Sequence, residues 1–123
     1  MALRDSMRAS AGQFLQPGEQ IHTVIGAQTQ SQYLMMAGAV IFLAKNKYRI
    51  IVATDRRLLI LDTGRWSVKK AKGIVGELPR ATRLGPPSGG VWHTVVLGPE
   101  KLRIHRRFFK DIAAADGVAT QAA

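Results

Sequence analysis

The sequence predicts a mainly β domain with helices (α+β), a small antiparallel barrel or sandwich of seven strands with a short N-terminal helix and a C-terminal helix. The chain of 123 residues has the length of one domain, and its 46% hydrophobic and 21% charged residues are typical of a globular protein. Short β-branched and apolar runs separated by turn residues fill positions 21–106. Helical spacing of apolar residues is confined to the two ends of the chain.

The elements follow in order along the chain. Leu3, Met7 and Phe14 recur at helical spacing, so residues 1–16 are predicted to hold an amphipathic helix that ends before Pro17. Residues 17–117 form the predicted β domain, with a Gly/Pro-rich loop at 85–90, and residues 118–123 are predicted to be a flexible tail after a helix capped by Gly117. The seven predicted strands are Ile21–Ala27, Lys47–Thr54, Arg57–Asp62, Trp66–Lys70, Ile74–Leu78, Val91–Leu97 and Lys101–Arg106.

The first predicted hairpin turns at Asp55-Arg56, which pairs Thr54 with Arg57 and makes Arg49 an exposed cross-strand partner of Asp62. Because side chains alternate between the faces of a strand, one face is an apolar barrel interior. The opposite face is also apolar and needs a cover. The interior face holds Tyr48, Ile50, Val52, Leu59 and Leu61, and the opposite face holds Ile51, Ala53, Leu58 and Ile60.

Three covers for that second face are considered: the apolar segment Tyr33–Ala44, the N-terminal helix, or a second copy of the chain. We favour a cover from within the chain, with a homo-oligomer as the alternative. The segment is too short to cross a bilayer as a helix, so it is interpreted as core, as an interface or as a membrane anchor. The candidate anchor or interface residues are Tyr33, Leu34, Met35, Met36, Ile41, Phe42 and Trp66.

In the second predicted hairpin, Leu97 lies opposite Glu100 and Trp92 opposite His105. This register places His93 among apolar residues, which indicates a core histidine. Trp92 falls on the opposite, basic face. We interpret that face as a solvated strand surface, with stacking on a nucleic-acid base or contact with a membrane interface as the alternatives.

Charge is the unusual property of this chain, with 18 Lys and Arg against 8 Asp and Glu and a net charge of +10. Residues 1–42 are neutral, whereas 43–83 carry eleven bases and three acids, a net +8. Such an excess favours a polyanionic partner. The candidate residues for binding an anionic surface are Lys45, Lys47, Arg49, Arg56, Arg57, Arg65, Lys69, Lys70 and Lys72.

Nothing in the sequence predicts catalysis, a metal or a cofactor. The chain has no cysteine, and the three histidines, His22, His93 and His105, do not have metal-ligand spacing. The acidic residues are scattered, and neither a nucleophile elbow nor a phosphate-binding glycine loop occurs. We therefore expect a non-enzymatic protein.

Two motifs resemble the bacterial PH-like (pleckstrin-homology-like) domain family: Leu15-Gln16-Pro17-Gly18-Glu19 and the strand Thr54-Asp55-Arg56-Arg57 with the apolar residues after it. The closing Phe108-Phe109-Lys110-Asp111-Ile112 is similar to the C-terminal helix of the family. The resemblance implies seven strands in two nearly orthogonal sheets closed by that helix. Lys47-Tyr48-Arg49 matches half of a lipid-binding pattern of eukaryotic relatives, whose other half is missing at Gln28-Thr29-Gln30.

The resulting hypothesis is a PH-like adaptor that binds anionic lipid headgroups or an acidic protein. It is expected in the cytoplasm or at the inner face of the membrane. The alternative is a nucleic-acid-binding module that uses the same basic residues with Trp66 and Trp92 as stacking platforms.

Overall fold

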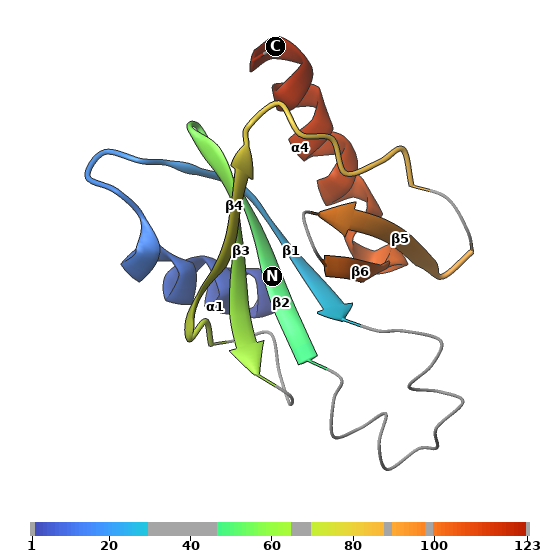
Figure 1. Cartoon of the computed structure of the whole chain (residues 1–123), viewed down its shortest axis with the longest axis horizontal. Coiled ribbons are helices and arrows are strands. Elements are labelled where there is room, and N and C mark those ends of the chain that lie inside the picture. The colour runs from blue at the N-terminus through green and yellow to red at the C-terminus, as the bar shows by residue number, and fades with distance from the viewer. Residues whose placement is uncertain (1, 30–46, 65–69, 88–89, 98–99, 123) are drawn as a thin grey trace.

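The computed structural model describes residues 2–29, 47–64, 70–87, 90–97 and 100–122 of the chain. The described part is mainly β, with one helix near each end (Figure 1). Helix α1 spans Ala2–Ala11 and continues as a 3-10 turn, η1, over Gly12–Phe14. Helix α4 spans Phe109–Ala122 and follows a second 3-10 turn, η2, at Arg106–Phe108.

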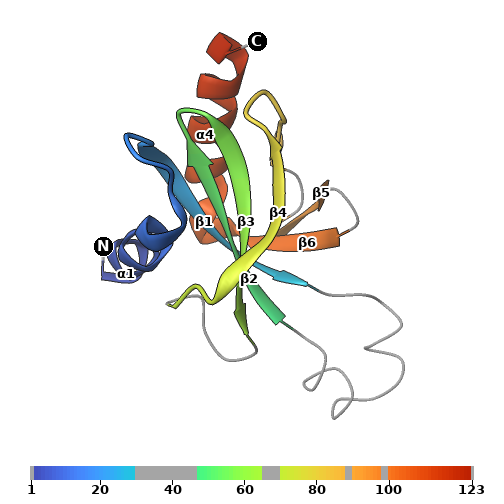
Figure 2. The same ribbon diagram turned by 60° about the vertical axis from the view of Figure 1, so that its left-hand side comes forward.

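Six strands in the described residues form one antiparallel sheet in the order β4-β3-β2-β1-β6-β5. The sheet is strongly twisted, so β6 runs across the direction of β3 (Figure 2). The α+β class is confirmed, but six strands are described rather than seven; the expected strand Trp66–Lys70 falls almost wholly outside the described residues. The strands are β1 Ile21–Thr29, β2 Lys47–Thr54, β3 Arg57–Gly64, β4 Gly73–Pro79, β5 Trp92–Leu97 and β6 Glu100–His105.

Both hairpin registers predicted from the sequence are confirmed. Val52 lies opposite Leu59 in the β2–β3 hairpin, and Trp92 lies opposite His105 in the β5–β6 hairpin. The ion pair of Arg49 with Asp62 forms at 2.8 Å, but the Arg49 side chain is only 8% exposed. The expectation of an exposed pair is therefore wrong.

Each face of the β2–β3 hairpin is covered by a helix. The face of Ile50 and Leu61, here called the α1 face, also carries Tyr48, which lines a groove together with Leu3 of α1. The opposite α4 face carries Ile51 and Ile60. The α4 face continues through β1 and β6 to the alternate residues of β5, among them His93, whose ring lies edge-on to Phe109 at the start of α4.

The core therefore has two layers, one on each side of the sheet. Met7 of α1 and Ile112 of α4 are both 0% exposed and belong to the same buried cluster as the strand residues. Cover from within the chain is confirmed, but its source differs from the expectation. The N-terminal helix covers the face predicted to be the barrel interior, while α4 packs on the face of Ile51 and Ile60.

Helix α4 also differs from the prediction at its end. It continues through Gly117 to Ala122, so the prediction that this glycine caps the helix is wrong. The carboxylate of Asp116 accepts the backbone N–H groups of Leu84 and Gly85 at 2.8 and 2.9 Å. This contact attaches the chain between β4 and β5 to the helix.

Candidate functional site: a basic groove on the α1 face

The two motifs that carry the family resemblance meet in the structure. Pro17 and Gly18 occupy the two central positions of a turn in which Glu19 N donates to Gln16 O, and Gly18 has φ +80. This is the residue pattern of a type II turn, which needs positive φ at its third position. The turn places the Glu19 side chain, 0% exposed, between Thr54 and Arg57.

Arg57 holds the Glu19 carboxylate with two parallel hydrogen bonds. Its Nε and Nη2 atoms donate to Oε2 and Oε1, both at 2.9 Å, and Thr54 Oγ1 donates to Oε2 at 2.6 Å. The Arg57 hydrogen bond is the largest cause that lowers the pKa of Glu19 to about 2, against the opposing effect of burial. Arg57 also pairs with Glu77. Its guanidinium is thus used inside the protein, although the sequence suggested a role in anion binding.

The predicted basic residues do not form one surface. Arg56 precedes β3, whereas Lys72 follows it and donates its backbone N–H to Asp62 near the other end of the strand. Asp62 lies five positions along the strand from Arg57, a distance of roughly 17 Å. Lys70 and Lys72 are exposed, and Arg49 is buried on Asp62.

Several predicted site residues are not placed. Lys45, Arg65, Lys69, Trp66 and the segment Tyr33–Ala44, including Tyr33, Leu34, Met35, Met36, Ile41 and Phe42, lie outside the described residues. The backbone of Lys47 is paired with Thr29 in the sheet. Arg49 is buried in its ion pair with Asp62. The Lys47-Tyr48-Arg49 pattern therefore has no exposed arginine that could bind a headgroup.

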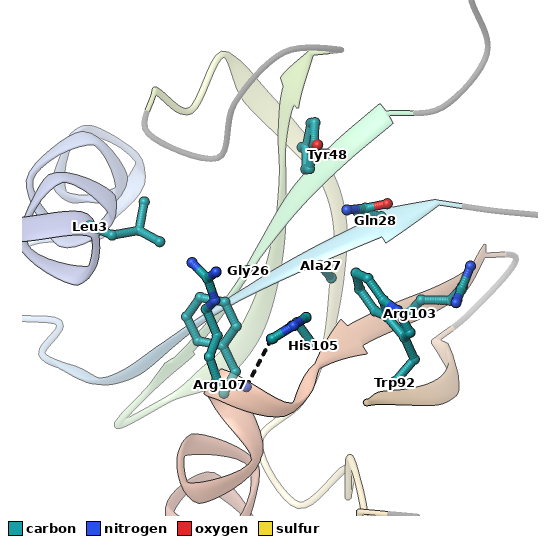
Figure 3. Close-up of a pocket in the computed structure, with 10 residues that line it drawn as sticks. Leu3, Gly26, Ala27, Gln28, Tyr48, Trp92, Arg103, His105 and Arg107 are labelled. Carbon is teal, nitrogen blue, oxygen red and sulfur yellow. Dashed lines mark hydrogen bonds between the residues drawn. The ribbon is translucent and has the colours of Figure 1, made fainter. Parts of the chain in front are cut away.

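A groove of about 270 Å³ lies on the α1 face, where α1, β1 and β2 meet β6 and the end of the β5–β6 hairpin. Arg107 lies at one end beside Leu3 and Gly26, Arg103 lies at the other beside Trp92, and His105 lies between them (Figure 3). The ten lining residues include no carboxylate; they are Leu3, Gly26, Ala27, Gln28, Tyr48, Trp92, Arg103, His105, Arg107 and Phe108.

Ring contacts orient the polar groups of this groove. The guanidinium of Arg103 lies over the Trp92 ring, 4.7 Å from its centroid, and His105 meets the same ring edge-on at 5.1 Å. The backbone N–H of Arg107 donates to His105 Nδ1 at 3.1 Å. The neutral imidazole therefore carries its proton on Nε2, which leaves Nε2 as a donor.

Sequence reasoning identified part of this site. Alternation along β5 and β6 correctly places Trp92, Arg103 and His105 on one face. That face is solvated at Thr94, Val96 and Lys101, as predicted, whereas Trp92, Arg103 and His105 are half-buried where they line the groove. Nothing in the sequence placed Leu3 or Arg107 in this groove, because their positions there depend on the packing of α1 and on the turn η2. His93 is a core histidine as predicted, 7% exposed, with Nε2 at 2.7 Å from Leu84 O.

Comparison with protein-family models, with curated proteins and with solved structures gave no match. The family resemblance therefore stays a prediction. No helix in the described parts of the chain has the length and hydrophobicity needed to cross a membrane. Those same parts contain no group of three or more His, Cys, Asp or Glu side chains that could hold a metal ion.

Proposed function

We propose that this protein is a non-enzymatic, PH-like binding domain. The support for the fold is the order of a twisted antiparallel sheet followed by a helix that packs on it, together with the contact between the two motifs. Glu19 and Arg57, which belong to separate motifs of the resemblance, bind each other directly. Their pairing gives a structural reason why both motifs would occur together.

The proposed activity is peripheral binding to an anionic membrane at its cytoplasmic face. This proposal rests on the surface of the β5–β6 hairpin that lies on the α1 face of the sheet, called the hairpin face below. On it Val96, 66% exposed, lies directly opposite Lys101, and Arg103 is stacked on Trp92. The hairpin face consists of Trp92, Thr94, Val96, Lys101, Arg103 and His105, and it contains no acidic residue.

This combination suits a lipid headgroup layer. Lys and Arg near an anionic bilayer contribute about 1 kcal/mol each, and an indole lies well at the boundary between polar and apolar regions. The exposed Val96 favours a membrane over a nucleic acid, because an aliphatic side chain cannot stack on a base as aromatic rings do.

The test is sedimentation with vesicles of phosphatidylcholine, alone or mixed with phosphatidylglycerol, at low and moderate salt. We compare V96D/K101E on β5–β6 with V75D/K72E, because Val75 is 49% exposed on β4 and Lys72 is also exposed. Both pairs change the net charge equally. We expect the hairpin pair to weaken binding to anionic vesicles by tenfold or more, and the β4 pair to weaken it less.

Equal losses in the two double variants would assign vesicle binding to net charge alone and would contradict the assignment to the hairpin face. A titration with single-stranded and duplex DNA at the same salt concentrations is the second arm. Binding to DNA with no binding to any vesicle would overturn the membrane proposal in favour of a nucleic-acid-binding module.

A further inference from the structure

The arginines that the structure describes differ in their partners. Arg4, Arg49 and Arg57 form ion pairs with Asp111, Asp62 and Glu19, respectively. The guanidinium groups of Arg103 and Arg107 have no acidic partner among the residues that the structure describes, and both line the groove on the α1 face. Two uncompensated guanidiniums in one concave site attract anions.

The two cations lie at the two ends of the groove, with the imidazole of His105 between them (Figure 3). The guanidinium of Arg103 lies over the Trp92 ring, and a cation–π contact of this kind does not use the N–H groups as hydrogen-bond donors. The N–H groups along its edge stay available for a carboxylate or phosphate, which they can bind in a bidentate manner.

Part of the groove lining is apolar. Leu3 of α1, at the end of the groove beside Arg107 (Figure 3), and Phe108, which is 4% exposed, provide this surface. Tyr48 and Trp92 add aromatic rings. A volume of about 270 Å³ is near the lower end of ligand pockets, and it suits a compact molecule better than a polymer chain.

We propose that this groove binds a small elongated organic dianion, with a carboxylate or phosphate group at each end of an apolar or aromatic body. One anionic group meets Arg107 and the other meets Arg103, while the body lies along the groove between them, beside His105. The site shares Trp92, Arg103 and His105 with the hairpin face, but its ligand is soluble and its occupancy does not depend on membrane binding.

The experiment is calorimetric titration of the whole chain with linear α,ω-dicarboxylates of increasing length, each beside the monocarboxylate of the same length. Aromatic carboxyphenyl phosphates test whether phosphate serves as one end group. We expect one dianion length to bind best, about tenfold or more tighter than its monoanion, because each end gains hydrogen bonds to a charged group. In a W66F variant, Trp92 is the one remaining tryptophan of the chain. Binding of the same ligand to this variant is expected to change the fluorescence of the Trp92 indole.

Two single variants locate the ends of the ligand. R107Q and R103Q each remove one guanidinium and are expected to reduce dianion binding to the level of the monoanion. R106Q is the matched control, because Arg106 is an exposed neighbour that does not line the groove. Backbone hydrogen bonding of Arg107 to His105 is retained in R107Q.

Three results would overturn the proposal. The first is equal affinity for dianions and monoanions, which would leave a single anion site. The second is an equal loss of binding in R106Q and R107Q, which would indicate nonspecific attraction by the basic surface. The third is the absence of binding for the whole series while far-ultraviolet circular dichroism shows a folded chain. Neither Val96 nor Lys101 lines the groove. A loss of vesicle binding in V96D/K101E therefore concerns the membrane proposal and leaves the dianion site untouched.

Discussion

Glu19 and Arg57 form a two-point ion pair across 38 residues of sequence, with Nε–Oε2 and Nη2–Oε1 distances of 2.9 Å. The pair joins the turn before β1 to the β2–β3 hairpin. A second link runs beside it, where Gln20 N donates to Asp55 Oδ1 and Asp55 N donates to Gln20 O. The lead-in to the sheet is thereby attached to the hairpin at its turn.

Replacement of Glu19 by Gln is expected to destabilise the protein by about 3 kcal/mol, because it leaves the largely buried Arg57 without its buried counter-charge. The pKa of Glu19 lies at about 2, below its ordinary 4.5. Since the folded state holds the lower pKa, the pair stabilises above pH 4.5, and this contribution is lost as the pH falls towards 2.

Urea denaturation at pH 7 and at pH 2.5 checks this sign. The gap in unfolding free energy between wild type and E19Q should narrow at the lower pH. A gap that is unchanged between the two pH values would show that the charge of Glu19 does not stabilise the fold.

Thr54 and Thr63 provide a matched pair of buried threonines. Thr54 Oγ1 donates to Glu19 and accepts the N–H groups of Arg56 and Arg57 at 3.1 Å. Within the described residues, Thr63 Oγ1 is buried without a hydrogen-bond partner. T54V should therefore cost about 1–3 kcal/mol, whereas T63V should be neutral or stabilising.

Thermal unfolding of both variants, with T54S as the variant that keeps the hydroxyl group, measures the difference. Equal destabilisation by T54V and T63V would contradict this prediction, because it would show that the hydrogen bonds of the Thr54 hydroxyl add nothing to stability.

Asp116 holds the connection between β4 and β5 through the N–H groups of Leu84 and Gly85. Nearby, buried Arg80 donates to Thr54 O at 2.6 Å and to Ala115 O at 3.2 Å, and burial lowers its pKa. We expect D116A to destabilise the protein by about 2–3 kcal/mol, because the buried N–H of Leu84 and the part-buried N–H of Gly85 lose their acceptor.

The control for D116A is D5A, which removes the same charge from an exposed position on α1. Chemical denaturation should show little change for D5A. If both variants lost a similar amount of unfolding free energy, the cause would be the change in net charge and not the lost contact with residues 84 and 85.

Helix α1 contributes to the hydrophobic core, because its Met7 side chain is 0% exposed. M7A is expected to cost about 2–4 kcal/mol because it leaves a cavity between α1 and the sheet. The control is A9S on the exposed side of the same helix, which should change the unfolding free energy by less than about 0.5 kcal/mol. If M7A were as stable as A9S, the helix would contribute no packing energy.

Local patterns account for the parts of this fold that the sequence predicted. The turn at Asp55-Arg56 and strict alternation set the β2–β3 register, and they placed Trp92 opposite His105 in the second hairpin. These features depend on backbone geometry over a few residues. The sequence also predicts that both faces of the first hairpin are covered, because both faces are apolar.

Tertiary structure decided which helix covers which face and which cations remain available. Arg57 and Arg107 are both arginines in basic runs, yet Arg57 meets Glu19 from a distant turn, and Arg107 lines a groove without a carboxylate. The charge of a residue is a property of its type. Whether that charge is already neutralised depends on residues far away in the sequence, and only the folded chain brings them together.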